Sequence, residues 1–161
     1  MQIAAWGVYN TKPDVSDKLA KISIKTKLIN NGTNAGNATI RNSILDAKNQ
    51  IVSNTSNQVN IGITNSASQN DEEIAQTFQI QHPKLWSPES PFLYHAVSEL
   101  SVNGKVIDKV TNSFGIRSIE ITADKGFLLH GKRILLRGGC MHHDNGRLGA
   151  ATIDRAELRR V

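Results

Sequence analysis

Strict alternation of apolar and polar residues between Leu19 and Ile29 constrains the fold of this chain more than any other feature. On an extended backbone, one side of this segment would carry Ile22, Ile24, Thr26 and Leu28, and the other Lys21, Ser23, Lys25 and Lys27. A period of two is typical of a strand with one face on a core and the other in water. The lysines on the wet face also oppose pairing between sheet edges of different molecules. The segment therefore predicts an antiparallel sheet.

Further β-type runs recur at regular spacing, separated by stretches rich in Asn, Ser and Gln. The runs that we predict as strands are Ile3–Val8, Leu19–Ile29, Ala38–Leu45, Gln50–Asn54, Val59–Thr64, Glu73–Ile80, Phe92–Val102 and Lys105–Arg117. Pro13 excludes a central strand at Thr11–Asp17, which we expect to be an edge or a turn. This spacing predicts an all-β sandwich of about seven strands.

The last two runs are joined at Asn103-Gly104, the strongest short hairpin signal in the sequence. The residues expected to face the core are Tyr94, Ala96, Leu100, Val102, Val106, Val110, Phe114 and Ile116. Before this pair, three prolines surround Trp86 between Gln81 and Pro91. We expect Trp86 to plug one end of the sandwich with its indole N–H on a carbonyl, and a sugar-stacking role is the alternative.

The last third of the chain has a different organisation. Two apolar runs, Phe127–Leu129 and Ile134–Leu136, are joined through residues 130–133, which predicts a hairpin with Gly131 at positive φ. A polar cluster then brings Arg137, His142, His143 and Asp144 together around Gly138 and Gly139. Asp154 and Glu157 form a capping box for a helix with Leu158 and Val161 on its inner face, and a helix this short needs a packing partner.

The run GFLLHGKRILLRGGCMHHDNGRLGA resembles the entry into the catalytic barrel of the family 2 glycoside hydrolases, the β-galactosidase and β-glucuronidase group. Upstream, PKLWSPESPFLY and the FGIR of Phe114–Arg117 are similar to signatures of the immunoglobulin-like domain before that barrel. The HHD of residues 142–144 is most similar to the β-galactosidase branch. The resemblance extends from about Trp6 onward and implies an immunoglobulin-like sandwich followed by a truncated first βα unit of a TIM barrel.

The resemblance also implies a division of the chain and of its roles. Residues 1–121 would form the sandwich domain, and residues 122–161 would be the start of the (β/α)8 barrel and poorly ordered on their own. His142 and Asp144 would contact the terminal sugar of an oligosaccharide substrate, and Arg137 would pair with a barrel carboxylate. The two catalytic glutamates of that family lie on later barrel strands, so we expect no catalytic residue in this chain, Glu72, Glu73, Glu89, Glu99 and Glu120 included.

Several other classes of function are disfavoured. The net charge of +5 arises mostly after residue 129, where 7 Lys and Arg face 3 Asp and Glu, and no aromatic residues alternate with these cations, so we expect no nucleic-acid partner. No window approaches the roughly 20 apolar residues of a membrane span, and we expect no membrane partner. Cys140, His142, His143 and Asp144 are capable zinc ligands, but their spacing is tighter than in separated ligand pairs, and we expect no metal and no cofactor.

The expected partners are the rest of a parent chain, namely its catalytic barrel and an amino-terminal sugar-binding-like domain. The parent would be an O-glycosyl hydrolase that cleaves terminal β-linked sugars by a two-carboxylate retaining mechanism, and this piece would be inactive alone. A free-standing immunoglobulin-like carbohydrate-binding or adhesion module is the alternative, and an independently active hydrolase is a third. We expect the bacterial periplasm or the cell exterior in preference to the cytoplasm, although the single Cys140 leaves the redox environment open.

Overall fold

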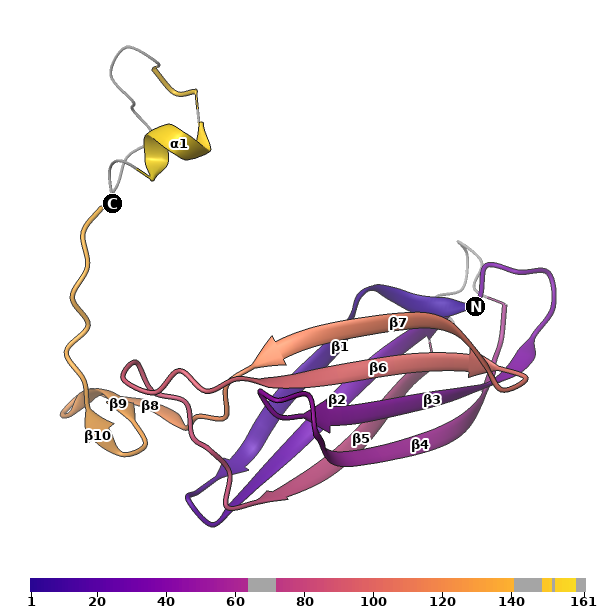
Figure 1. The fold of residues 1–161 in the computed structure, drawn as a ribbon, viewed down its shortest axis with the longest axis horizontal. Coiled ribbons are helices and arrows are strands. Elements are labelled where there is room, and N and C mark those ends of the chain that lie inside the picture. The colour runs from indigo at the N-terminus through magenta and orange to yellow at the C-terminus, as the bar shows by residue number, and fades with distance from the viewer. Residues whose placement is uncertain (64–71, 141–148, 152, 159–161) are drawn as a thin grey trace.

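The computed structural model describes residues 1–63, 72–140, 149–151 and 153–158, and its body is a sandwich of two antiparallel sheets (Figure 1). One sheet has the order β1-β2-β5, with β1 at Gln2–Val15, β2 at Leu19–Ile29 and β5 at Glu72–Gln81. The other has the order β4-β3-β6-β7, with β3 at Gly36–Leu45, β4 at Ile51–Ile61, β6 at Tyr94–Val102 and β7 at Lys105–Phe114. The predicted all-β, immunoglobulin-like sandwich of about seven strands is confirmed.

The apolar and polar residues that alternate along β2 are alternately buried and more exposed in the structure. Ile22, Ile24, Thr26 and Leu28 have no exposed surface, whereas the residues between them are half-buried or exposed. The strand is central in its sheet, paired with β1 on one side and β5 on the other. Burial of its apolar face against the second sheet therefore fixes which way the strand lies, because a one-residue slip would turn every isoleucine to water.

The first strand is longer than predicted because it is an edge. β1 continues through Pro13, whose missing N–H is tolerated on the open side of an edge strand. Its pairing with β2 jumps from Ile3 opposite Leu28 to Val8 opposite Thr26, so several extra residues bulge out of the ladder. In that bulge Trp6 is fully exposed with a φ of 58°.

The hairpin between β6 and β7 forms at the predicted turn, where Asn103 and Gly104 have φ values of 50° and 77°. The prediction for Val106 was wrong. The register shifts between Leu100 and Ser101, so that Val106 pairs with the outward Ser101 and is 48% exposed. A bulge changes the face of every residue beyond it, and sequence periodicity alone does not place it.

The runs predicted as two strands, Gln50–Asn54 and Val59–Thr64, are one strand, β4. The polar residues between them continue the ladder with β3, for example Thr55 opposite Asn42 and Asn57 opposite Ile40. Because β4 is an edge strand with much of its surface in water, a polar run does not interrupt it.

The core between the sheets has two apolar clusters. One contains Ala20, Ile22, Ile24, Ile44, Phe78, Ile80, Tyr94, Ala96, Phe114 and Ile116. The other contains Ile3, Leu28, Ala38, Ile40, Val59, Ile61 and Leu100. Both sheets contribute to each cluster, so burial of apolar area across the interface holds the two layers together.

A small third sheet, in the order β10-β9-β8, follows the sandwich. It consists of β8 at Ile119–Thr122, β9 at Gly126–Leu129 and β10 at Lys132–Arg133. The predicted hairpin with Gly131 at positive φ is present, but its loop is only His130-Gly131, with φ values of 51° and 72°. The predicted strand Ile134–Leu136 was therefore wrong, because a two-residue turn starts the return strand at Lys132.

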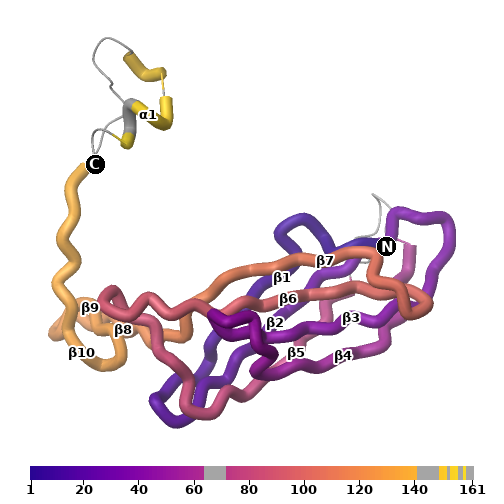
Figure 2. Tube along the Cα trace, in the orientation of Figure 1, coloured from indigo at the N-terminus to yellow at the C-terminus, as the bar shows by residue number. Residues whose placement is uncertain are grey.

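After β10 the chain runs away from the sandwich without regular structure to residue 140 (Figure 2). The capping-box segment forms one short helix, α1 at Asp154–Glu157, closed by the bond from Leu158 N–H to Asp154 O at 2.9 Å. Leu158 is 77% exposed, so its predicted inward position was wrong for this chain. The strand, loop and helix of a barrel unit, and the boundary at residue 121, stay predictions. Among the described residues no helix is long and apolar enough to cross a membrane.

Candidate functional site

The residues predicted to contact a sugar, His142 and Asp144, lie outside the described residues, as does His143. Arg137 and Cys140 are described, and both are exposed beyond the small sheet. The sugar-binding prediction therefore stays a prediction. Within the described residues no group of three His, Cys, Asp or Glu side chains could hold a metal ion.

The glutamates of the two sheets and of the small sheet lie in surface ion pairs or in solvent. Glu73 accepts a bond from Lys25 Nζ at 2.7 Å, and Glu99 pairs with Lys109 at 3.1 Å. The bond from Glu73 raises the pKa of Lys25, as expected for an ammonium that gains an anion. Glu72, Glu89 and Glu120 are exposed. These are the surroundings of surface ion pairs and solvated acids, which differ from the flanking carboxylates of a glycosidase.

The first candidate surface is an apolar platform at the end of the sandwich from which the small sheet extends. A hollow of about 220 Å³ there is lined by Trp86, Pro88, Arg117, Ile119, Phe127, Leu129, Ile134 and Leu136. We call this surface the C-terminal platform. Ile119, Ile121, Leu135 and Leu136 on and beside it are 48% to 76% exposed. A cluster of large exposed apolar side chains is typical of a surface that meets another domain.

Trp86 is fixed in the platform by its backbone and by its neighbours. Its backbone N–H donates to Ile116 O at 2.8 Å, and Leu85 forms a β-bridge with Ile116. A Cβ on Gly115 would lie 2.7 Å from the Trp86 side chain, so only glycine fits beneath the indole. The Arg117 guanidinium lies 4.7 Å from the ring centroid on a cation–π contact. Trp86 is half-buried at the end of the sandwich, with Arg117 over the ring.

His130 joins the small sheet to the sandwich, a role that the sequence analysis missed. Its Nε2 lies 3.0 Å from Trp86 O, and its Nδ1 lies 3.3 Å from Ser118 Oγ. Its backbone N–H also donates to Ser118 O at 3.0 Å. Its place in a hairpin turn next to a glycine gave no signal of this, because the partners are far away in sequence. With His130 and Trp86 in contact, the platform is a continuation of the sandwich.

Two cations flank the same end of the sandwich. Lys12 Nζ lies 5.2 Å from the centroid of the Phe114 ring, on the strand that leads to Arg117. Burial, and then repulsion by Arg117, lowers the pKa of Lys12. Among the described residues neither cation has a carboxylate within ion-pair distance.

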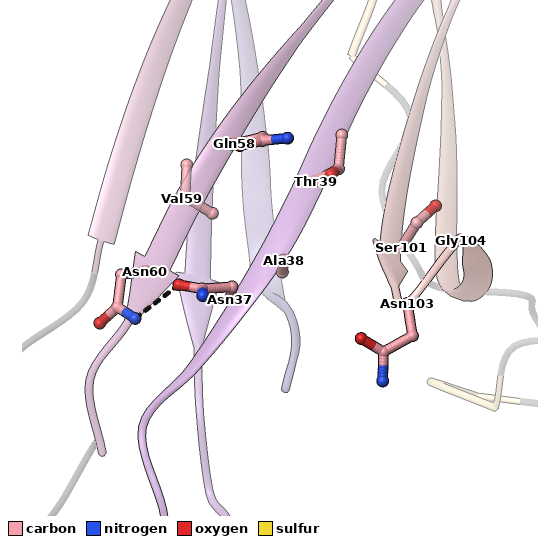
Figure 3. A pocket seen from close by; sticks show the side chains of 9 residues that line it. All are labelled: Asn37, Ala38, Thr39, Gln58, Val59, Asn60, Ser101, Asn103 and Gly104. Atoms are coloured by element: carbon pink, nitrogen blue, oxygen red, sulfur yellow. Dashed lines mark hydrogen bonds between the residues drawn. The ribbon is translucent and has the colours of Figure 1, made fainter.

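A second surface lies on the outer face of the four-stranded sheet (Figure 3). This outer groove has a volume of about 460 Å³ and is lined by Asn37, Ala38, Thr39, Gln58, Val59, Asn60, Ser101, Asn103 and Gly104. Asn60 Nδ2 donates to Asn37 Oδ1 at 2.7 Å, and the remaining polar side chains are spread along the groove. The described residues of its lining supply carboxamides, hydroxyls and two small apolar residues, Ala38 and Val59, and none of them is charged or aromatic, so hydrogen bonds are the main contacts that it offers a ligand.

Comparisons with known proteins agree with the motifs. The sequence profile of the glycosyl hydrolases of family 2 matches residues 8–117. A β-galactosidase of Bacteroides ovatus is 33% identical across the whole of this chain, which spans 18% of that relative. A β-glucuronidase of Bacteroides fragilis is 33% identical over 94% of the chain and 21% of its own length. The crystal structure of a family 2 member from Bacteroides cellulosilyticus superposes with a TM-score of 0.84 at 34% identity, covering 99% of this chain and 20% of that one.

Proposed function

The chain belongs to family 2 of the glycosyl hydrolases, and from that premise we propose that it is the sandwich domain that supports the catalytic barrel of a β-galactosidase-type enzyme. It is a fragment in length, about a fifth of the relatives that it matches. The parent would cleave terminal β-linked sugars from oligosaccharides by the retaining mechanism, with two carboxylates about 5 Å apart in the barrel. His142 and Asp144 would orient the sugar there.

The observation that carries this proposal is the C-terminal platform. Apolar side chains as exposed as Ile121 and Leu136, at 76% and 74%, lower the solubility of a free domain but suit one that is covered by its neighbour. The platform is built jointly by residues of the family-matched sandwich, such as Trp86 and Arg117, and by residues of the segment that resembles the barrel entry, such as Phe127 and Leu136. The barrel that follows in the parent would then lie against this surface.

The cations Lys12 and Arg117 predict a property of the domain that would cover the platform. Lys12 and Arg117 lie near enough to one another for repulsion to lower the pKa of Lys12, and among the described residues neither has a carboxylate partner: Arg117 lies over the Trp86 ring, and Lys12 lies over the Phe114 ring and donates to Asn10 Oδ1 at 3.2 Å. A covering surface would bury both cations further, which is unfavourable unless a carboxylate accompanies it. The barrel face that meets the platform should therefore carry at least one acidic residue near Arg117.

The test compares this chain with the longer polypeptide of its gene. Purified alone, the 161-residue chain should release no aglycone from a chromogenic β-galactoside or β-glucuronide. In the longer polypeptide, Ile121→Asp should lower the melting temperature and the galactosidase activity, since it places a charge in the covered surface. Ile51→Asp is the matched control, because Ile51 is 62% exposed on the edge strand β4 and does not line the platform. Aglycone release by the chain alone, or equal effects of the two substitutions, would contradict the proposal.

A carbohydrate-binding module is the second candidate, favoured by the outer groove. Carboxamides and hydroxyls pair with sugar hydroxyls, and the neutral lining suits a neutral sugar better than a uronate. Without an aromatic ring for stacking, we expect binding no tighter than about millimolar. Titration of the ¹⁵N-labelled chain with a galacto-oligosaccharide should leave the amides of Gln58 and Asn103 unshifted if the chain is a support alone. Saturable shifts at these residues, abolished by Gln58→Ala, would favour the module.

A further inference from the structure

On each of four strands, one inward-facing position between the two apolar clusters of the core is polar. These residues are Thr26 on β2, Asn42 on β3, Gln76 on β5 and Ser98 on β6, and none is more than 4% exposed. The next inward residues on either side are apolar, for example Ile24 and Leu28 around Thr26, and Ala96 and Leu100 around Ser98. We call these four residues the polar belt. The belt separates the two apolar clusters of the core.

The belt is only partly satisfied by its own hydrogen bonds. Asn42 Nδ2 donates to Thr26 Oγ1 at 3.0 Å across the two sheets, and Gln76 Nε2 donates to Asn57 Oδ1 at 2.6 Å. Among the described residues, Asn42 Oδ1, Gln76 Oε1 and Ser98 Oγ have no partner. Rotating the Asn42 amide by half a turn would bring its oxygen to Thr26 and leave its nitrogen unpaired instead, so one end always lacks a partner.

Leaving a buried polar atom without a hydrogen-bond partner is unfavourable, and native proteins rarely keep several such atoms together. Asn42 and Ser98 are direct partners on the neighbouring strands β3 and β6, and their side chains face the same interior. We propose that the polar belt is an internal water site, in which one water molecule bridges Asn42 Oδ1 and Ser98 Oγ. Water fits this pair because it donates to the amide oxygen and either donates to or accepts from the hydroxyl.

The chemistry of the belt favours water over an ion. All four side chains are neutral, and among the described residues no charged one is buried. A buried cation or anion would lack a compensating charge, which is strongly unfavourable in a core of low polarity. A water shared between strands also ties β3 to β6 at the level where Asn42 already ties β3 to β2. The site would therefore fix the relative height of the two sheets.

A crystal structure of the 161-residue chain at a resolution that places waters tests the site directly. The expected result is a density peak within hydrogen-bond distance of both Asn42 Oδ1 and Ser98 Oγ. A direct bond between these two side chains with no peak beside them would overturn the inference. In solution, ¹⁷O magnetic relaxation dispersion should detect at least one long-lived internal water, and its absence would equally overturn the inference.

Ser98→Val gives an independent measurement, because its methyl groups would occupy the position of the water. The dispersion amplitude should fall by about one water molecule relative to the wild type. Ser101→Val is the matched control on the same strand, since Ser101 faces the outer groove and its substitution should leave the amplitude unchanged. If both variants keep the full amplitude, the water does not lie at Ser98. If Ser98→Val does not fold, Ser98→Ala replaces it, with the water expected to lose occupancy.

Discussion

Between residues 1 and 116 a core of large apolar side chains is buried between the two sheets, whereas after residue 118 most of the large apolar side chains described face solvent. Ile22, Ile40, Ile44 and Leu100 have no exposed surface. Ile119, Ile121, Leu135, Leu136, Ile153 and Leu158 are between 48% and 77% exposed. Leu128 and Leu129 are buried, but where the small sheet meets the sandwich.

The difference shows which part of the chain contains its own packing partners. Every inward row of the sandwich meets another inward row of the same chain, so the information for that fold is complete between β1 and β7. The later segment has apolar residues of the same kind but no second layer among the described residues. In the proposed function this segment would supply one side of an interface with the rest of a longer polypeptide, and the chain spans about a fifth of its relatives.

Truncating an apolar side chain should give the largest difference in unfolding free energy between the two regions. Ile40→Ala in the buried centre of β3 should lower the free energy of unfolding by about 2–5 kcal/mol, because it removes buried area and leaves a cavity. Leu136→Ala on the platform should change it by less than about 0.5 kcal/mol, because Leu136 is 74% exposed. Urea denaturation followed by circular dichroism measures both. Similar losses would mean that the platform is packed within this chain.

Substitution of glycine tests the junction between the regions. In Gly115→Ala the new Cβ would lie 2.7 Å from Trp86, so the indole must move away from the end of the sandwich. We expect a loss of about 1–3 kcal/mol in unfolding free energy and a shift in tryptophan emission. Gly62→Ala is the control, since no described residue comes within 4 Å of its Cβ position, and it should be neutral or slightly stabilising. A neutral Gly115→Ala would show that Trp86 is not held by this contact.

The hydrogen bonds of His130 should have a smaller and more local effect. His130→Asn keeps a residue that tolerates the φ of 51° but does not reach Trp86 O. The small sheet should then open more often, with faster amide exchange at residues 126–133 by a factor of about 5–10, equivalent to roughly 1 kcal/mol. Exchange in β2 should be unchanged. Lys132→Ala, in the exposed strand of the same hairpin, should leave both rates unaltered.

The same contrast explains how far the sequence was predictive. Periodicity was enough to predict β2, where one face packs on the core and the other meets water, and the Asn103-Gly104 pair was enough to predict the turn between β6 and β7. It failed where the deciding interaction is made with another strand or with a residue far away in sequence. The bulge that turns Val106 outward depends on pairing with β6, and the unbroken β4 depends on the ladder with β3. His130 reaches Trp86, 44 residues earlier, and no local pattern records that. The predicted sugar contacts, His142 and Asp144, lie outside the described residues.

The smallest expected effect is a pH dependence of thermal stability that arises in one loop of the sandwich. Asp46 Oδ1 accepts the backbone N–H of Gln50 at 2.9 Å and that of Lys48 at 2.8 Å, closing the turn between β3 and β4. The bond from Gln50, followed by that from Lys48 and the charges of nearby lysines, lowers the pKa of Asp46 below its ordinary value of 3.8. A carboxyl whose pKa is lower in the folded state stabilises the fold above pH 3.8 and loses that contribution as the pH falls through its folded value.

Asp46→Asn should therefore melt slightly lower than the wild type at pH 7, and the two curves should converge as the pH falls below about 4. Thermal melts between pH 2 and 7 measure the difference. Asp124→Asn provides the comparison, because Asp124 lies in the turn between β8 and β9 of the small sheet, outside the sandwich. If the wild type and Asp46→Asn differ equally at every pH, the carboxylate charge does not stabilise the turn. In that case the strands on either side would hold this loop in place, just as the contacts of His130 with Trp86 and Ser118 join the small sheet to the sandwich.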